Sequence, residues 1–334
     1  MTNGMIDRRR VCMTIALAPA LCGDALAQAP SDAASAFPDH RIQVILPFPG
    51  GGIVDIVTRI VTDKMSETWK QPIIVEPRPG ANGNIAWDVV ARAAPDGYTW
   101  TFFSPSTIVN PRLQPGLRWS EKDFVAIGAA VWAPTVITVH PSLAANTIAE
   151  FIDHVHKNPR MLNWGNPGIG SSPHLVTALL LSTGKLDMVE VAYKGQPPAI
   201  IDLMANRIQM KAASIGLVAE HVKSGALKAL AVVGKTRSPL LPSVPTLTEA
   251  GYADVNLVAW YGYAAPRATP PAIVDKIVAA FNAALADPKV RATLEAQGLQ
   301  VVEPMSAADL TALVAADTEK YAKLIKDTGM KIDN

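Results

Sequence analysis

Pro47-Phe48-Pro49-Gly50-Gly51-Gly52-Ile53-Val54-Asp55 is the stretch around which the rest of this 334-residue sequence is arranged. A continuous apolar run over residues 42–46 precedes it, which is typical of a buried parallel strand. After it, residues 56–69 carry apolar side chains at helical spacing. The sequence therefore predicts a strand, a glycine-rich turn and a helix.

The three consecutive glycines let the backbone adopt positive φ angles and approach a ligand without an intervening Cβ. The first amides of the following helix have no intrahelical acceptor and lie at the positive end of the helix dipole. A carboxylate or a phosphate fits such a site without a charged side chain. We therefore interpret the turn as part of a pocket for a small anion. A strand-to-helix turn without a ligand is the alternative.

The turn differs from two well-known nucleotide-binding loops. A Walker A loop requires a Lys after its last Gly, and no Lys follows here. A dinucleotide-binding turn requires G-x-G-x-x-G, and Asp55 stands where the third Gly should be. We expect the Asp55 carboxylate instead to accept hydrogen bonds from amides of the turn and to stabilise the loop.

Three more turns of similar character follow predicted strands. Residues 77–84, 104–107 and 165–174 are rich in Gly, Pro, Ser or Asn, and each opens a predicted helix. Open α/β sheets bind ligands at the carboxyl ends of their strands, where such turns lie. The pattern therefore extends the candidate site from one turn to four.

Strands and helices alternate before about residue 135 and again between about residues 160 and 233, which predicts two α/β units. The chain would cross between them near residues 131–139 and return near residues 255–262. We expect one lobe from residues 40–134 and 262–334, with the closing helices packed back on it, and a second lobe from residues 135–261. Two lobes of this kind place a ligand cleft where they meet.

The N-terminus has the features of a secretory signal peptide. Arg8-Arg9-Arg10 is a basic segment, a short apolar segment follows it, and Ala25-Leu26-Ala27 is a cleavage signal. We expect residues 1–27 to be removed after export and residues 28–39 to be a disordered lead-in. The apolar segment is too short for a permanent membrane anchor.

Composition narrows the classes of function. The 30 basic and 29 acidic residues nearly balance, which argues against a nucleic-acid partner held by bulk electrostatics. Both cysteines, Cys12 and Cys22, belong to the predicted signal peptide. Residues 28–334 therefore cannot use thiol catalysis, disulfides or Cys-ligated zinc. We expect no metal and no cofactor.

Several motifs together resemble the extracytoplasmic solute receptors of tripartite tricarboxylate transporters, the Bug receptor family. They keep their order from about residue 38 to the end of the chain: Pro47-Phe48-Pro49-x-Gly51-Gly52, Arg78-Pro79-Gly80-Ala81-x-Gly83-Asn84, Ala94-Pro95-Asp96-Gly97-Tyr98, Tyr193-Lys194-Gly195, and Arg237-Ser238-Pro239 with Pro242-x-Val244-Pro245-Thr246.

The resemblance implies a periplasmic binding protein rather than an enzyme. It implies two α/β lobes, each a mostly parallel sheet flanked by helices, that close on a small organic carboxylate. It also implies a monomer that hands its ligand to the membrane subunits of a tripartite transporter. The ligand-binding residues that we expect are Phe48, Pro49, Gly50, Gly51, Gly52, Ile53, Val54, Asp55, Asn82, Gly83, Ser104, Ser106, Gly168, Ile169, Gly170, Ser171, Ser172, His174 and Ala213.

Two positions depart from the family pattern. Val54 replaces a common Ser or Thr, and Ala213 lies in a segment where the family commonly has Asp. If both face the ligand, an aromatic or largely apolar carboxylate fits better than citrate, and Trp260, Tyr261 and Tyr263 could supply ring contacts. The alternative is that Val54 and Ala213 face the core and carry no information about the ligand.

Two other functions stay open at this level. A receptor that senses a solute and signals to a membrane partner would share these features. A secreted hydrolase would use Ser171 or Ser172 with His174, but the G-x-S-x-G motif is absent.

Overall fold

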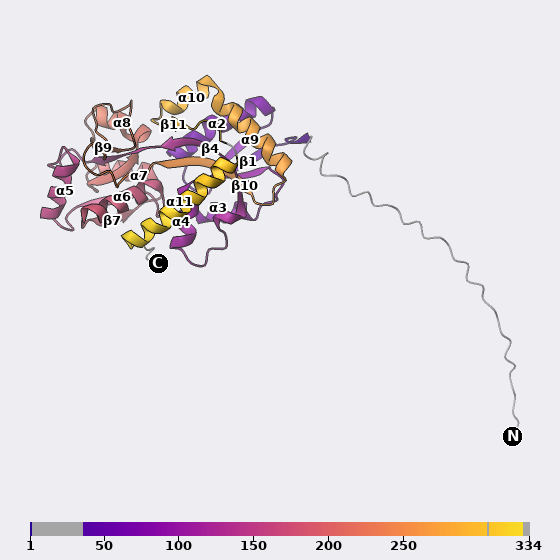
Figure 1. The fold of residues 1–334 in the computed structure, drawn as a ribbon, viewed down its shortest axis with the longest axis horizontal. Helices are drawn as coiled ribbons and strands as arrows, with labels where there is room; N and C mark the ends of the chain where they lie inside the picture. The colour runs from indigo at the N-terminus through magenta and orange to yellow at the C-terminus, as the bar shows by residue number, and fades with distance from the viewer. Residues whose placement is uncertain (2–35, 306, 330–334) are drawn as a thin grey trace. The chain divides into compact units, whose positions relative to one another are not determined.

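The computed structural model describes residues 36–305 and 307–329, together with Met1. Residues 37–334 form one unit by their contacts, and Figure 1 traces its elements in chain order. The predicted signal peptide, apart from Met1, and the first part of the predicted lead-in lie outside the described residues. The folded unit begins earlier than predicted, because Phe37 is 5% exposed and its ring contacts Trp69 and Tyr98.

The first sheet has the strand order β11-β4-β10-β3-β1-β2. Four of its strands run in one direction, namely β1 (Ile42–Leu46), β2 (Ile73–Pro77), β3 (Thr99–Phe103) and β4 (Phe124–Ala133). The long strand β10 (Ala259–Pro266) and the short strand β11 (Gln300–Val301) run the opposite way. Because β1, β2 and β3 are parallel neighbours, their carboxyl ends and the turns that follow them lie at one edge of the sheet.

Two groups of helices accompany this sheet. The first group packs together and consists of α2 (Ile53–Trp69), α9 (Pro271–Ala286) and α10 (Pro288–Glu295). In α2, buried residues recur every three or four positions, as expected for a helix with one face on the core. The second group consists of α3 (Asn84–Ala91), α4 (Pro105–Leu113) and α11 (Ala307–Thr328), and two short 3₁₀ turns, Ala81–Gly83 and Glu121–Asp123, adjoin it.

The second sheet has the strand order β7-β6-β8-β5-β9. Here β5 (Thr135–Val139) alone runs against its neighbours; the others are β6 (Asn163–Asn166), β7 (Val189–Ala192), β8 (Met210–Ser214) and β9 (Lys228–Val233). In each sheet, therefore, most strands share one direction. The two-sheet α/β class predicted from the sequence is confirmed.

Successive side chains of the second sheet point alternately into two hydrophobic clusters, one on each face of the sheet. Ile137 and Ala212 pack with helices α5 (Ile148–Lys157) and α6 (Ser172–Gly184). Their neighbours Val136 and Ala213 pack with α7 (Gln196–Met204) and α8 (Ile215–Lys223). The sheet is thus covered by helices on both faces.

Two segments of the chain connect the sheets, and one helix packs on both. The chain crosses at Pro134, between β4 and β5, and returns through residues 234–258, between β9 and β10. Helix α11 packs against α4 and β4 of the first lobe, and its residues Tyr321 and Leu324 also join the cluster of α5 and α6. The Trp260 indole of β10 donates to Asp317 of the same helix at 2.7 Å. Helix α11 therefore links both lobes.

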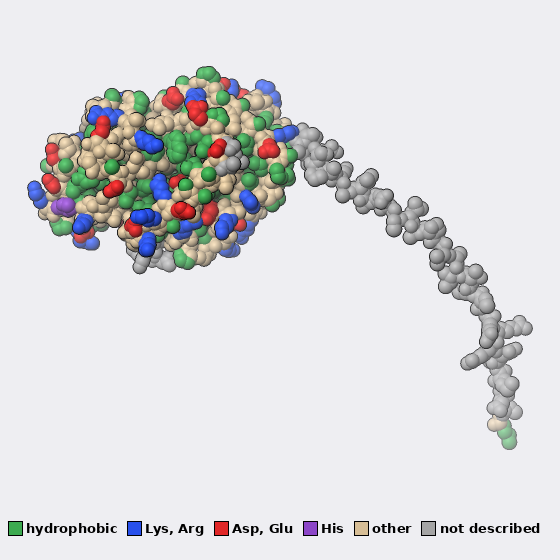
Figure 2. Space-filling view, viewed as in Figure 1, with side chains coloured by type: hydrophobic (Ala, Val, Ile, Leu, Met, Phe, Trp, Pro, Cys, Tyr) green, Lys and Arg blue, Asp and Glu red, His purple; other side chains and the backbone are tan. Residues whose placement is uncertain are grey.

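Charges of both signs are intermixed on the face of the molecule shown in Figure 2. One cation is placed very differently, because Lys211 of β8 is fully buried and its ammonium group donates to the Ala212 carbonyl at 3.0 Å. Burial lowers the pKa of Lys211 from about 10.5 to about 7. Between these two values the unfolded chain binds one more proton than the folded chain, so this residue makes stability rise with pH over that window.

We expect Lys211→Met to stabilise the protein by about 2–4 kcal/mol near pH 6 and by much less near pH 10, since the buried ammonium is removed. Urea unfolding of both proteins across this pH range measures the difference. Lys157→Met, which changes an exposed lysine at the end of α5, is the control. An equal effect of Lys211→Met at both pH values would contradict the argument.

Candidate ligand-binding site

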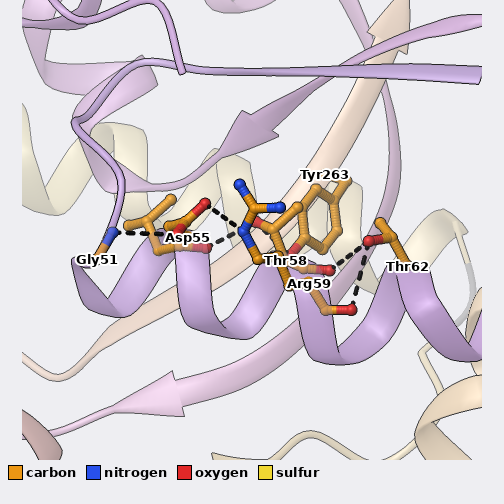
Figure 3. A network of polar contacts seen from close by, with 7 residues as sticks. Gly51, Asp55, Thr58, Arg59, Thr62 and Tyr263 are labelled. Atoms are coloured by element: carbon orange, nitrogen blue, oxygen red, sulfur yellow. Dashed lines mark hydrogen bonds and ion pairs between the residues drawn. The ribbon is translucent and has the colours of Figure 1, made fainter. Parts of the chain in front are cut away.

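The Pro47–Asp55 turn connects β1 to α2, as predicted, and is held by the carboxylate of Asp55. The Gly51 amide donates to Asp55 at 3.0 Å, and the Arg59 guanidinium donates to the other carboxylate oxygen at 2.9 Å. Figure 3 shows this contact beside the Thr58–Tyr263 hydrogen bond on the same helix. Gly51 has φ +78°, a conformation that favours glycine. The predicted role of Asp55 in stabilising the loop is confirmed.

The start of α2 keeps its amide donors available. Gly52, at the N-cap, has an extended backbone, and no side chain caps the helix. The first backbone hydrogen bond of the helix is donated by the Ile56 amide to the Gly52 carbonyl at 3.1 Å. The amides of Ile53, Val54 and Asp55 precede it and have no intrahelical acceptor, so they present a partial positive charge.

The turn before α6 is also internally braced and also leaves donors available. Asn166 accepts from the Gly168 amide at 2.9 Å, and His174 accepts from the Gly170 amide at 3.2 Å through Nδ1. Ser171, at the N-cap, makes no capping hydrogen bond, and its hydroxyl is buried without a partner in the described chain. The Ser172 amide at the first helical position likewise has no intrahelical acceptor.

Two other helix starts nearby offer fewer free donors. At α4, the Ser104 hydroxyl accepts from the Ser106 amide at 3.2 Å, and the Ser104 amide donates to the Thr107 hydroxyl at 3.3 Å. Helix α7 begins Gln196-Pro197-Pro198, and proline has no amide hydrogen. The starts of α2 and α6 are thus uncapped, and residues of both line one pocket.

A pocket lies between these two helix starts and has an empty volume of about 490 Å³, open solvent included. Its lining contains no Asp, Glu, Lys, Arg or His; the residues are Phe48, Pro49, Gly52, Ile53, Val54, Phe102, Ser104, Ser106, Pro167, Ser171, Ser172, Pro173, Gly195, Gln196, Pro197 and Tyr261. An anion in this pocket would be held by amide and hydroxyl dipoles, against apolar and aromatic walls.

A polar network reaches the pocket from the strand β10. Tyr261 is buried, and burial raises its pKa to about 12, while hydrogen bonding with the Ser214 and Ser172 side chains opposes the rise. The phenol therefore keeps its proton and can donate. The Gln196 amide group both donates to the Ser214 hydroxyl at 2.8 Å and accepts from the Ser214 amide at 2.9 Å, so its orientation is fixed.

The structure brings nine of the predicted site residues together in the pocket: Phe48, Pro49, Gly52, Ile53, Val54, Ser104, Ser106, Ser171 and Ser172. Three line a neighbouring groove: Asn82, Gly83 and Gly168. The others are outside both linings: Gly50, Gly51, Asp55, Ile169, Gly170, His174 and Ala213. Ala213 faces the α7–α8 cluster, and Gly170 packs against Asn110 of α4.

Sequence reasoning missed several lining residues. Phe102 is the penultimate residue of β3, and Gln196 follows the Tyr193-Lys194-Gly195 motif. Position at the end of a strand, or directly after a motif, was therefore the available signal. Of the three aromatic residues suggested for ring contacts, only Tyr261 lines the pocket. Trp260 turns to α11, and Tyr263 donates to Thr58 of α2 at 2.9 Å.

His174 supports the second turn as a neutral ring. Burial lowers its pKa to about 4, and the unprotonated Nδ1 accepts from the Gly170 amide. No hydrogen bond connects the Ser171 hydroxyl to this ring within the described residues, so the nucleophile–base contact of a serine hydrolase is absent there.

A family model for the tripartite tricarboxylate transporter family receptor, TctC, matches residues 57–330. The chain belongs to the TctC family. The resemblance inferred from the sequence motifs is thereby confirmed.

Relatives of this TctC-family protein span its whole length. A UPF0065 protein from the tcbD-tcbE intergenic region of Pseudomonas sp. strain P51 is 34% identical over 96% of this chain and 94% of that protein. BugT of Bordetella pertussis is 32% identical over 90% of this chain and 92% of BugT. These matches include the segment before residue 57 that the family model leaves out.

Solved structures match the fold of this TctC-family protein. The periplasmic binding protein BugD superposes with a TM-score of 0.84 at 31% identity, over 88% of this chain and 99% of BugD. MatC from Rhodopseudomonas palustris with bound malate gives 0.82 at 31% identity, over 86% and 100%. R. palustris Rpa4515 with adipate gives 0.84 at 27% identity, over 88% and 99%. The predicted two-lobed, periplasmic-binding-protein-like architecture is confirmed.

Two features are absent from the described part of this TctC-family protein. None of its helices is long and apolar enough to span a membrane. No group of three or more His, Cys, Asp or Glu side chains is arranged to hold a metal ion there.

We expect the stability contributed by His174 to be complete above pH 6.5 and to fall as the pH drops toward 4, because only the unfolded chain takes up a proton in that window. His174→Gln removes this titration, so its unfolding midpoint should change less than that of the wild type between these pH values. His156→Gln, at an exposed histidine of α5, should keep the wild-type slope. Identical slopes for all three proteins would contradict the assignment.

Proposed function

We propose that this TctC-family protein is a periplasmic receptor that binds a small organic carboxylate between its two lobes. The observation that supports this proposal best is the pairing of two uncapped helix starts, α2 and α6, across a pocket without charged side chains. The unpartnered hydroxyl of Ser171 lies at the same place. An anionic oxygen is the group that satisfies all of these donors at once.

The carboxylate would accept amide hydrogen bonds from the start of α2 and hydrogen bonds from Ser171 and Ser172 of the second turn. Each charge-assisted hydrogen bond contributes roughly 1.5–3 kcal/mol, so two or three suffice to orient the ligand. Binding therefore joins the lobes through the ligand, and closure about the crossings at Pro134 and residues 234–258 is the associated hinge motion.

The body of the ligand is, in our proposal, aromatic or largely apolar. Phe48, Phe102 and Tyr261 supply ring surfaces, and Val54 adds an aliphatic side chain to the lining. Malate and adipate, bound by two relatives, have two carboxylates. This pocket has no cation for a second carboxylate, so a single carboxylate on an apolar body suits it better.

We further propose export with cleavage after about Ala27, a monomeric mature protein, and delivery of ligand to the membrane subunits of a tripartite transporter. Membership of the TctC receptor family supports the transporter partner, and the basic segment, apolar segment and cleavage signal support export. No cofactor or metal enters this proposal. Co-purification of the mature protein with candidate membrane subunits tests the partner.

We expect residues 28–334 to bind benzoate-type acids more tightly than citrate, and Ser171→Ala to weaken that binding about 5- to 10-fold, since one hydrogen bond of about 1–1.5 kcal/mol is lost. Calorimetric titration, supported by the thermal shift that a ligand of the folded state produces, measures both effects. Ser224→Ala, at an exposed serine after α8, is the control. Preference for citrate would overturn the apolar ligand, and no binding of any acid would overturn the receptor proposal.

We expect Val54→Thr to shift the preference toward hydroxylated acids such as malate by about 3- to 10-fold relative to benzoate, because it restores a donor inside the pocket. Val54→Ile keeps the pocket apolar and serves as the matched control. The ratio of the two dissociation constants is the readout. An unchanged ratio in Val54→Thr would mean that residue 54 does not face the ligand.

A further inference from the structure

A second hollow, which we call the outer groove, adjoins the pocket. It is lined by residues 47–49 and 79–83 of the first lobe and by residues 167–168 and 192–195 of the second, and has an empty volume of about 790 Å³, open solvent included. Two of the sequence motifs, Arg78–Asn84 and Tyr193–Gly195, supply much of this lining. Neither motif has a role in the pocket's contacts to the carboxylate.

The outer groove and the pocket share a wall. Phe48 and Pro49 from the first lobe and Pro167 and Gly195 from the second line both hollows. These four are the residues that the two linings share. A group that moves from the outer groove to the pocket therefore passes between them.

Two glycines of the second lobe, Gly195 in the wall and Gly168 beside it, lie close to rings of the first lobe. A Cβ added to Gly195 would lie 3.2 Å from the Pro49 ring, and one added to Gly168 would lie 3.9 Å from the Phe48 ring. At these two glycines the backbone of the second lobe thus approaches ring side chains of the first without an intervening side chain of its own. Such a contact can separate and re-form with little rearrangement.

The lining of the outer groove carries one charged side chain, that of Lys194. Lys194 is exposed. Its neighbours are arranged differently: the Tyr193 hydroxyl donates to Asp202 at 2.9 Å, and Arg207 neutralises the same carboxylate. The groove therefore carries a positive charge at its surface, next to the wall, while the pocket behind it carries none.

We propose that the outer groove is the entrance of the binding pocket and that Lys194 is an encounter site for the incoming carboxylate. This inference rests on the proposed function, because it concerns how the same ligand arrives. The anion pairs first with the solvated ammonium of Lys194. The anion then leaves Lys194 and passes between Phe48–Pro49 and Gly195. Inside the pocket it accepts hydrogen bonds from the amides of α2 and from the Ser171 hydroxyl.

The charge distribution predicts a specific kinetic signature. A single exposed charge beside an entrance raises the local concentration of anions and hence the association rate, and salt screens this effect. Because Lys194 does not line the pocket, it makes no contact with the bound carboxylate, and the dissociation rate does not depend on it. The effect on affinity therefore comes from association alone.

The test is stopped-flow binding of benzoate, and in a second series malate, to residues 28–334. We expect Lys194→Gln to lower the association rate about threefold and Lys194→Glu about tenfold at about 10 mM salt, with unchanged dissociation rates. All three proteins should converge near about 1 M salt, where the screening length is about 3 Å. Lys235→Gln, which removes the same charge beside a separate hollow, should behave as wild type.

A chemical version of the test uses the absence of cysteine from residues 28–334. Lys194→Cys then carries the only thiol, which can be labelled with positive or negative reagents of equal size. The positive label should restore the association rate, and the negative label should lower it further. Equal rates with both labels would mean that bulk rather than charge matters.

The outcomes separate the two proposals. If neither acid binds saturably, the proposed function itself fails. If both acids bind but the association rates of the Lys194 variants equal that of the wild type, only the encounter site is overturned. If Lys194→Gln instead raises the dissociation rate of malate alone, Lys194 holds a second carboxylate in the bound state, which would also overturn the inference.

Discussion

The structure depends on one electrostatic constraint, the unsatisfied amides at the starts of α2 and α6. A helix begins with amides that have no acceptor of its own, and most helices satisfy them with a capping side chain or with water. The start of α4 follows that rule, with Ser104 and Thr107 closing a capping box. The starts of α2 and α6 do not, because Gly52 has no side chain and the Ser171 hydroxyl makes no bond to the helix. Both helix starts face one pocket, so an acceptor between them serves both lobes.

The loops around the pocket are braced from behind, which keeps their donors in place. Asp55 ties the first turn through Gly51 and is itself neutralised by Arg59. Asn166 and His174 tie the second turn through Gly168 and Gly170. These four side chains do not line the pocket, and by ordering the loops in advance they lower the cost of ordering on binding. Preorganisation of this kind explains why polar residues outside the lining belong to the same functional unit.

Much of this arrangement could be read from the sequence, for identifiable reasons. Glycine-rich turns after apolar runs placed the two helix starts, since a local pattern determines a local structure. The direction of individual side chains could not be read in the same way. Ala213 and Val54 are both apolar replacements, yet Val54 lines the pocket and Ala213 packs against α7 and α8. Which face of β8 meets the cleft depends on strand register, and register is set by tertiary pairing.

Long-range contacts were likewise beyond the sequence. The apolar spacing of α11 predicted a packed helix but not that Tyr321 and Leu324 would join the second lobe's core. Tyr261 was identifiable as an aromatic residue near a crossing, whereas its contact with Ser172 and Ser214 requires β10 to lie against the second lobe. Contacts between segments far apart in the chain leave no periodic signal in one sequence.

The choice of dipoles over charges in the pocket follows from what burial does to a cation. Lys211 is the example within this protein: full burial lowers its pKa to about 7, so its charge would depend on small changes in pH. Backbone amides do not titrate, and Tyr261, with a pKa of about 12, keeps its proton throughout the neutral range. A carboxylate held by such donors is bound equally well over a wide range of pH. The exposed charge of Lys194 avoids the desolvation cost because it stays in water at the groove. The protein thus separates attraction at a distance, which needs a charge, from retention in a dry pocket, which works better without one.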